Sequence, residues 1–429
     1  MIRRLVVLML LVGGAVLLEP LGAPTEGVIA PRSLFLFGIL LLTADTFGAV
    51  AHDLRTPRLV GYLLAGLALG PSVAGVVPAG VLEDLSMMKR LAVGLIGLLA
   101  GAELRIGDLR DRWRILGSIL TFQTVTVIAL LLGATLLLQR WIPFLAGLDR
   151  EAVFFVALLF AVLLTVNSPM VTLALLTETR ASGPLARTTL GVVLVADVVI
   201  ILLFTGAFSL AQASLGTAVG APDIMMGLLR GVFGSMLAGA LVGGVLSLYL
   251  RFVKRELVLF AVVVVFATAA AAQELEFELL LSLLVAGFLV ENVAPVRAEP
   301  LLEALHQMAV PVFVIFFALA GAELHVQGFL ALWPVVLGVA LIRMGGIYVA
   351  ATGGSRVGQA EPAVSRYVWT GLVSQAGVAL GLATIVADRL PVVGIAMQTM
   401  VIGVVAFNES VGPILFRWGL LRAQEVKVT

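Results

Sequence analysis

The sequence predicts an all-α protein that crosses a membrane many times, and three observations lead to this fold class. The chain of 429 residues is 61% apolar and only 12% charged, with a mean hydropathy of +1.14, which is too apolar for a soluble globular protein. Apolar runs of about 17 to 25 residues recur along it, long enough to cross a bilayer as helices. These runs do not consist of segments of about ten residues with alternating apolar and polar side chains, which is the pattern of transmembrane strands. We therefore expect 13 or 14 transmembrane helices.

The segments follow one another with short polar connections. They lie near residues 4–18, 33–50, 58–77, 88–104, 115–138, 152–177, 187–212, 226–250, 256–273, 279–292, 306–324, 330–352, 366–387 and 392–421. Residues 1–30 form either a signal peptide or an extra span, and residues 31–429 are expected to form one membrane domain with no soluble C-terminal domain. Lys and Arg gather in the connections after even-numbered segments and in the tail, which predicts a cytoplasmic C-terminus.

Two short strings recur in the same order. AGAEL occupies 100–104 and 320–324, and LLAGLALG at 63–70 is echoed by LLVAGFLV at 283–290. Seven predicted spans separate the members of each pair, an odd number, so the two halves would have opposite orientations. We therefore predict inverted repeats over about 33–212 and 256–421, an organisation typical of secondary transporters that bind their substrates near the membrane midplane.

Each half contains a segment with helix-breaking residues. Pro169 interrupts the segment 152–177, and Gly371, Gly377 and Gly381 weaken the segment 366–387. We expect one broken helix in each half. The polar residues at the breaks either offer oxygens to a dehydrated alkali cation or only satisfy the freed backbone; they are Thr165, Asn167 and Ser168 in the first half and Ser374 and Gln375 in the second.

Asp197 stands alone among apolar residues in LGVVLVADVVIILLF, residues 190–204. A charged side chain near the middle of a span is costly in a bilayer and usually marks an ion or proton path. A carboxylate can hold either a cation or a proton, so Asp197 is the first candidate for an exchange site. The alternative is that it compensates a helix dipole or pairs with an arginine.

Two further charged residues lie within predicted spans. Arg343, in VVLGVALIRMGGIYVAA, keeps its proton and cannot carry one. It neutralises the C-terminal ends of half-helices, pairs with Asp197, or takes a direct part in coupling. Glu409, in AFNESVGP, has either a coupling role or a structural one.

Other function classes find no support in the sequence. There is no cysteine, and the three histidines are scattered without metal-binding spacing. No phosphate-binding loop follows a strand, and no nucleophile lies beside a base. We therefore expect no enzyme activity, no cofactor, no metal beyond an alkali cation and no nucleic-acid partner.

With these residues placed, the chain resembles the monovalent cation/proton antiporter superfamily, in the branch of bacterial Na+/H+ exchangers and glutathione-gated K+ efflux antiporters. The resemblance covers about residues 34–421. It is carried by TPRLVGYLLAGLALGPS, GLLAGAEL, GPLARTTLGVVLVADVV, SQAGVALGLA and NESVGPILFRWGL.

The resemblance implies a homodimer in the inner membrane, with a panel domain that anchors each protomer and a core domain that moves as an elevator. Asp197 falls on the family's essential aspartate and Arg343 on its late-span basic residue. The position before the aspartate is typically Asp, Asn or Gln in the family, and here it is Ala196. One carboxylate with an arginine implies electroneutral exchange of one cation per proton.

The expected function is therefore exchange of Na+ or K+ for protons. A gated K+ efflux path with loose proton coupling is an alternative within transport. A membrane sensor or assembly subunit that keeps the fold without transport is a second alternative, favoured by Ala196. The soluble nucleotide-binding domain of the K+ efflux branch has no counterpart in the sequence, so ligand gating would require a separate regulatory subunit.

Overall fold

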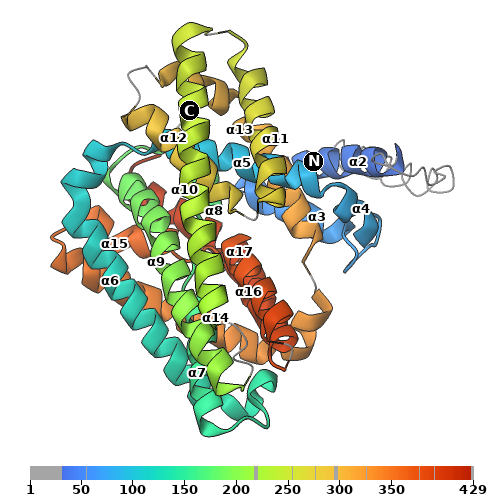
Figure 1. Cartoon of the computed structure of the whole chain (residues 1–429), viewed down its shortest axis with the longest axis vertical. Coiled ribbons are helices and arrows are strands. Elements are labelled where there is room, and N and C mark those ends of the chain that lie inside the picture. Colours follow the sequence, from blue (N-terminus) through green and yellow to red (C-terminus); the bar gives the residue numbers. More distant parts are fainter. Residues whose placement is uncertain are drawn as a thin grey trace. The chain divides into compact units, whose positions relative to one another are not determined.

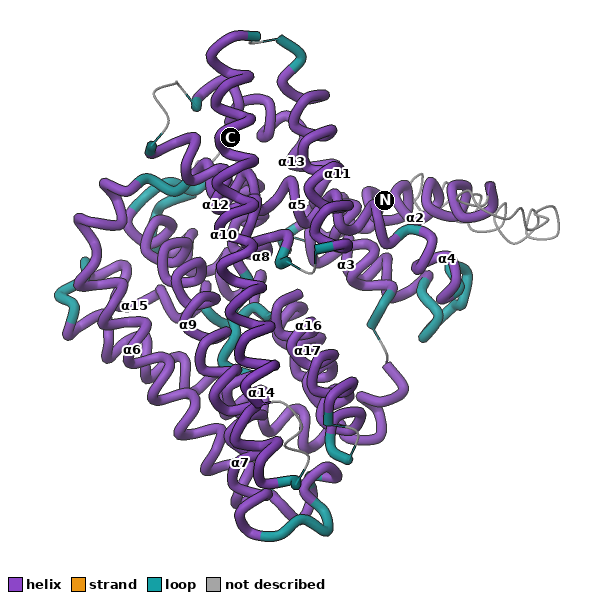
Figure 2. Tube along the Cα trace, viewed as in Figure 1, coloured by secondary structure: helices purple, strands orange, loops and turns teal. Residues whose placement is uncertain are grey.

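A computed structural model describes residues 31–54, 56–216, 221–253, 255–275, 277–293, 298–324, 326–375, 377–390 and 392–426. Within these ranges every regular element is helical (Figures 1 and 2). Eight of the described helices are long and apolar enough to cross a membrane, and shorter apolar helices lie at Arg58–Leu69, Leu279–Asn292 and Val378–Ala387. The predicted all-α membrane fold is therefore confirmed. The segment predicted at 4–18, and residues 1–30 as a whole, lie outside the described residues.

The chain divides into two compact units, and unit 1 comprises Met1–Arg105 and Phe233–Val326. Its helices are α2 (Pro31–Asp53), α3 (Arg58–Leu69), α4 (Ala79–Asp84), α5 (Ser86–Glu103), the second half of α10 (Ala221–Phe252), α11 (Leu257–Glu274), α12 (Leu279–Asn292) and α13 (Glu299–Ala322). Within the unit, α3 packs against α13 and α5 packs against α12.

Glycines bring the backbones of these two helix pairs into direct contact. A Cβ atom on Gly66 of α3 would lie 2.0 Å from the carbonyl oxygen of Ala318 on α13. A Cβ atom on Gly287 of α12 would lie 2.3 Å from the carbonyl oxygen of Leu98 on α5. No larger side chain fits at either position, so both glycines set the helix spacing.

The reciprocal contacts use glycines of the repeated AGAEL strings. A Cβ on Gly101 would lie 2.0 Å from the carbonyl oxygen of Leu284, and one on Gly321 would lie 2.1 Å from that of Leu63. The pair α3 with α13 is thus built like the pair α12 with α5: Gly101 and Gly321 occupy the same position of AGAEL, and Gly66 and Gly287 lie one position apart in the other two strings. The inverted repeats over about 33–212 and 256–421 remain a prediction.

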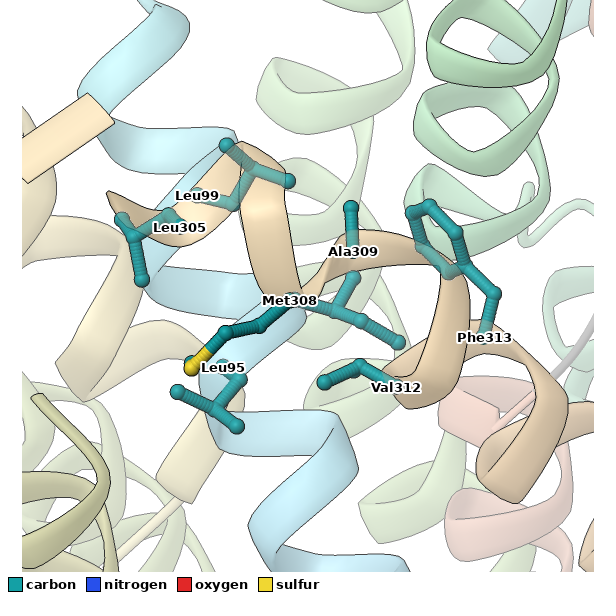
Figure 3. A pocket seen from close by; sticks show the side chains of 8 residues that line it. Leu95, Leu99, Leu305, Met308, Ala309, Val312 and Phe313 are labelled. Carbon is teal, nitrogen blue, oxygen red and sulfur yellow. The ribbon is translucent and has the colours of Figure 1, made fainter. Parts of the chain in front are cut away.

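Ion pairs close both ends of the interface between α5 and α13. Glu103, at the end of α5, lies 2.8 Å from Nε2 of His306. Lys89, near the start of α5, pairs with Glu323, which follows α13. Between these ends the contact is apolar: Leu95 and other side chains line a void of about 10 Å³ (Figure 3). This volume holds one water-sized sphere at most, so the interface is packed and is not a binding site.

Unit 2 comprises Ile106–Val232 and Gln327–Thr429. Its long helices are α6 (Ile106–Leu137), α9 (Pro184–Ser214), α14 (Val326–Val357) and α17 (Gly394–Arg422), and its shorter ones are α7 (Arg150–Leu163), α8 (Pro169–Thr179), α15 (Pro362–Gly371) and α16 (Gly377–Arg389). Two 3-10 turns, η2 (Gln139–Trp141) and η3 (Pro143–Leu145), connect α6 to α7. The two predicted breaks are therefore found in this unit, between α7 and α8 and between α15 and α16.

Candidate functional site

The first break is buried and capped by its own residues. α7 ends at Leu163 and α8 begins at Pro169, whose missing N–H costs nothing at the first helical position. The Oγ of Ser168 accepts a hydrogen bond from the backbone N–H of Val171 at 3.2 Å, which caps α8. The backbone carbonyls after α7 are left to find other donors.

Arg343 of α14 supplies those donors. Its side chain is completely buried. Its Nε donates to the carbonyl oxygen of Leu164 at 2.5 Å, its Nη2 to that of Val166 at 2.9 Å, and its Nη1 to that of Val373 in the second break at 2.6 Å. The carbonyls that follow α7 and α15 lie at the negative ends of the helix dipoles. A fixed cation at this place stabilises both.

Amide side chains extend this cluster. Gln375 donates through Nε2 to the carbonyl oxygen of Leu164 at 3.0 Å, and its Oε1 accepts from Nδ2 of Asn408 at 2.8 Å. Oδ1 of Asn167 accepts from Nε2 of Gln123 at 3.0 Å and lies 3.5 Å from Nη2 of Arg343. The side-chain oxygens of Asn167 and Gln375 are thus engaged in holding the breaks together.

The predicted hydroxyl residues differ from these amides. The hydroxyl of Thr165 donates to the carbonyl oxygen of Ala161 at 2.8 Å, which leaves its oxygen lone pairs available. Ser374 is buried and lies against Gly412, where a Cβ atom would come within 2.2 Å of its Oγ. Among the predicted polar residues, the hydroxyl oxygen of Thr165 is therefore well suited to bind a cation, while that of Ser168 already accepts from Val171 N–H and keeps one lone pair.

Asp197 lies half-buried on α9, directly after the buried Ala196. α9 packs against α7 and α8, the two helices on either side of the first break. Glu409 is buried on α17 beside Asn408, and α17 packs against α8, α15 and α16. The packing of α9 and α17 within unit 2 brings the helices of both carboxylates against the helices that flank the breaks.

Gln123 and Asn408 are not among the site residues predicted from the sequence. Gln123 is an amide within the apolar run of α6, and Asn408 is the neighbour of the predicted Glu409. A buried amide requires partners, so both pointed to a polar cluster. Their partners come from distant parts of the chain, which the local sequence does not reveal.

The end of α9 that precedes Asp197 is held by a second arginine. Arg112 of α6 donates through Nη1 to the hydroxyl of Thr188 at 3.0 Å, and through Nη1 and Nη2 to the carboxylate of Glu361 at 3.1 and 2.6 Å. The hydrogen bonds from Arg112 lower the pKa of Glu361 below its usual value. The carboxylate is therefore ionised at neutral pH, and the pair links α6, α9 and the start of α15.

Comparison with known protein families shows to which family the chain belongs. Residues 38–421 match the model of the family described as "Sodium/hydrogen exchanger, transmembrane". The chain belongs to this family. The predicted membership of the monovalent cation/proton antiporter superfamily is confirmed. The expectation that the chain is not an enzyme is also confirmed, because the family and the structural neighbours are transporters.

Two solved structures of the sodium proton antiporter MjNhaP1 from Methanocaldococcus jannaschii share the fold. One, determined at pH 8, is 16% identical in sequence with a TM-score of 0.63, and covers 92% of this chain and 98% of its own. The other, from an electron microscopy map, is 14% identical with a TM-score of 0.65, and covers 92% and 99%. At these identities the likeness concerns the fold alone.

A curated relative is the iron transporter MagA of Paramagnetospirillum magneticum. It is 28% identical over 164 residues, which make up 38% of this chain. The match spans 35% of the length of that relative, so its substrate does not transfer directly.

Proposed function

We propose that this protein exchanges a monovalent cation, Na+ or K+, for protons across a membrane, with Asp197 as the group that binds either one. One observation carries the proposal: Arg343 holds the carbonyl ends of both helix breaks within the same unit that contains Asp197. Membership of the sodium/hydrogen exchanger family supports the reaction class.

In this mechanism the cation replaces the proton on the Asp197 carboxylate, so both are never carried together. The hydroxyl oxygens of Thr165, Ser168 and Ser374 complete the coordination of the dehydrated cation. Asn167 and Gln375 hold the two breaks in place instead of binding the ion. Arg343 keeps its charge throughout and stabilises the carbonyl ends, and Glu409 has a supporting, charge-compensating role.

The unit that contains both breaks would move as one body, because Arg343 and Gln375 tie the first break to α14 and to the second break. Such a body could expose Asp197 to each side of the membrane in turn, as an elevator does. We further propose a homodimer in the inner membrane with a cytoplasmic C-terminus. Since Ala196 adds no second carboxylate, exchange would be electroneutral, one cation for each proton.

The test is dissipation of a preset pH gradient in proteoliposomes on addition of Na+, K+, Li+ or choline, with Fe²⁺ added to the panel because of the iron transporter relative. The wild type should respond to one or two alkali cations and not to choline. Asp197→Asn should abolish the response, and Asp111→Asn, a change at an exposed position of α6, should preserve it.

Other outcomes would favour other functions. Flux of K+ that does not depend on a pH gradient would indicate a gated efflux path. A folded wild type that transports no more than Asp197→Asn would reject transport and favour a sensor or assembly subunit. A steady current in a leak-free membrane would contradict electroneutral exchange.

A further inference from the structure

A side chain from the tail after α17 holds the first turn of α9. Leu185 N–H donates to Oε1 of Glu425 at 2.7 Å, and Ala186 N–H donates to Oε2 at 2.8 Å. The backbone carbonyl of Glu425 accepts from Ser182 N–H at 3.1 Å. Glu425 is only 8% exposed. The tail is therefore docked on α9 by its backbone and by both carboxylate oxygens.

The local sequence explains why the carboxylate is needed. A polar side chain just before the first turn can cap a helix, but α9 is preceded by Gly183, which has no side chain, and Pro184 has no N–H. The first two N–H groups of the helix are those of Leu185 and Ala186, and both donate hydrogen bonds to the Glu425 carboxylate. An anion at the positive end of a helix dipole is stabilising.

Gly183 also provides the space for this contact. A Cβ atom there would lie 2.4 Å from Cδ of Glu425 and 2.7 Å from its Oε1. An alanine at position 183 would therefore push the carboxylate away from the helix end while leaving Glu425 itself in the chain.

The capped turn leads without interruption to Asp197. α9 runs from Pro184 to Ser214 as one helix, and 12 residues at about 1.5 Å each place Asp197 about 18 Å beyond Leu185. A change of register by one residue would rotate its carboxylate by about 100°. The contacts that hold the first turn therefore act on the direction of Asp197 together with Arg112 at Thr188 and the packing of α9 against α7 and α8.

We propose that Glu425 is a positioning residue for Asp197: the tail carboxylate locks the first turn of α9 and so makes the tail part of the transport machinery. This proposal rests on the function proposed above. It assigns a role in ion binding to a residue that lies after the last membrane helix.

Antiport in proteoliposomes, normalised to folded protein, tests the proposal. In Glu425→Ala and in Gly183→Ala the half-saturating cation concentration should rise by about fivefold, the size of a typical capping effect, and the pH midpoint should shift. The double variant should be no worse than either single one, because both remove one contact. Formate or acetate should restore Glu425→Ala by occupying the vacated helix end. A chain truncated after Val426 keeps Glu425 and should behave as the wild type.

Unchanged cation affinity and pH midpoint in Glu425→Ala and Gly183→Ala, with only a lower yield or melting temperature, would overturn the proposal and leave Glu425 a role in folding alone. If the wild type shows no antiport at all, the proposed function is wrong. Hydrogen exchange then tests separately whether the Glu425 carboxylate stabilises the first turn of α9. The amides of Leu185 and Ala186 should exchange about fivefold faster in Glu425→Ala than in the wild type. Equal exchange rates in the two proteins would show that Glu425 does not stabilise the first turn of α9.

Discussion

Both units of the molecule use glycines to bring apolar helices close together, as at Gly66 in unit 1 and Gly354 in unit 2, but they differ in what lies between the helices. In unit 1 glycines let backbones touch, as where Gly66 meets Ala318 and Gly101 meets Leu284. In unit 2 a buried arginine and several amides hold two interrupted helices together. Close backbone packing suits a rigid platform, whereas carbonyls freed by broken helices require donors and create a polar interior. Apolar composition alone therefore does not distinguish a unit with an apolar interior from one with a polar cluster at its centre.

The largest effect is expected from Arg343→Ala, which removes a buried cation and its hydrogen bonds to three backbone carbonyls, of which that of Leu164 keeps a second donor, Gln375. Breaking a buried charged network of this kind costs about 3 to 5 kcal/mol, so the variant should lose its cooperative melting transition in detergent, and antiport with it. Arg343→Lys should retain only part of the stability and antiport of the wild type, since an ammonium group cannot reproduce the planar set of donors of the guanidinium. A melting temperature for Arg343→Ala equal to that of the wild type would show that unit 2 does not depend on this cluster.

Unit 1 should respond instead to added volume. Gly101→Ala and Gly321→Ala each place a methyl group about 2 Å from a backbone carbonyl oxygen, and overpacking of this kind costs about 1 to 3 kcal/mol. The two variants should lower the melting temperature by similar amounts, because they occupy corresponding positions. Gly38→Ala of α2, where nothing lies within 4 Å, is the control and should be neutral or stabilising. Clearly different losses of melting temperature in Gly101→Ala and Gly321→Ala would show that the two positions are not equivalent.

A smaller effect is expected from the amide chain in unit 2. Gln375→Leu removes the acceptor for Nδ2 of Asn408, and a buried group left unpaired costs about 1 to 3 kcal/mol; the carbonyl of Leu164 loses one donor but keeps Arg343. Asn408→Leu alone should cost less, and the double variant should fall short of the sum of the two, because the residues share one hydrogen bond. Thermal melting of the three variants measures this coupling. Full additivity would mean that the bond contributes nothing.

The smallest effect concerns the partly exposed pair of Arg112 and Glu361. Because the folded protein lowers the pKa of Glu361, the pair contributes stability at neutral pH and loses it as the pH falls through that lowered value. A pair of this exposure contributes at most about 1 kcal/mol. Glu361→Gln should therefore melt slightly below the wild type at pH 7, and the difference should vanish at acid pH. A difference that persists on acidification would contradict the assignment.

The sequence predicted the fold class, the two breaks and the residues around them, because prolines, glycines and a buried charge leave local signals. It also predicted a structural role for Arg343 as one of three alternatives, and its hydrogen bonds to the carbonyls of Leu164, Val166 and Val373 favour that one. The roles of Asp197 and Glu409 remain predictions. The sequence did not reveal that the oxygens of Asn167 and Gln375 are occupied, since their partners Gln123 and Asn408 lie far away in the chain. Glu425 was missed for the same reason.

The two ion pairs that close α5 against α13 make the ends of unit 1 chemically unequal. At one end Glu103 meets His306, and at the other Glu323 meets Lys89. Lysine stays charged throughout the physiological range, whereas histidine gains or loses its charge within it. The contact between Glu103 and His306 is therefore an ion pair only while the imidazole is protonated, whereas the contact between Glu323 and Lys89 does not depend on a histidine.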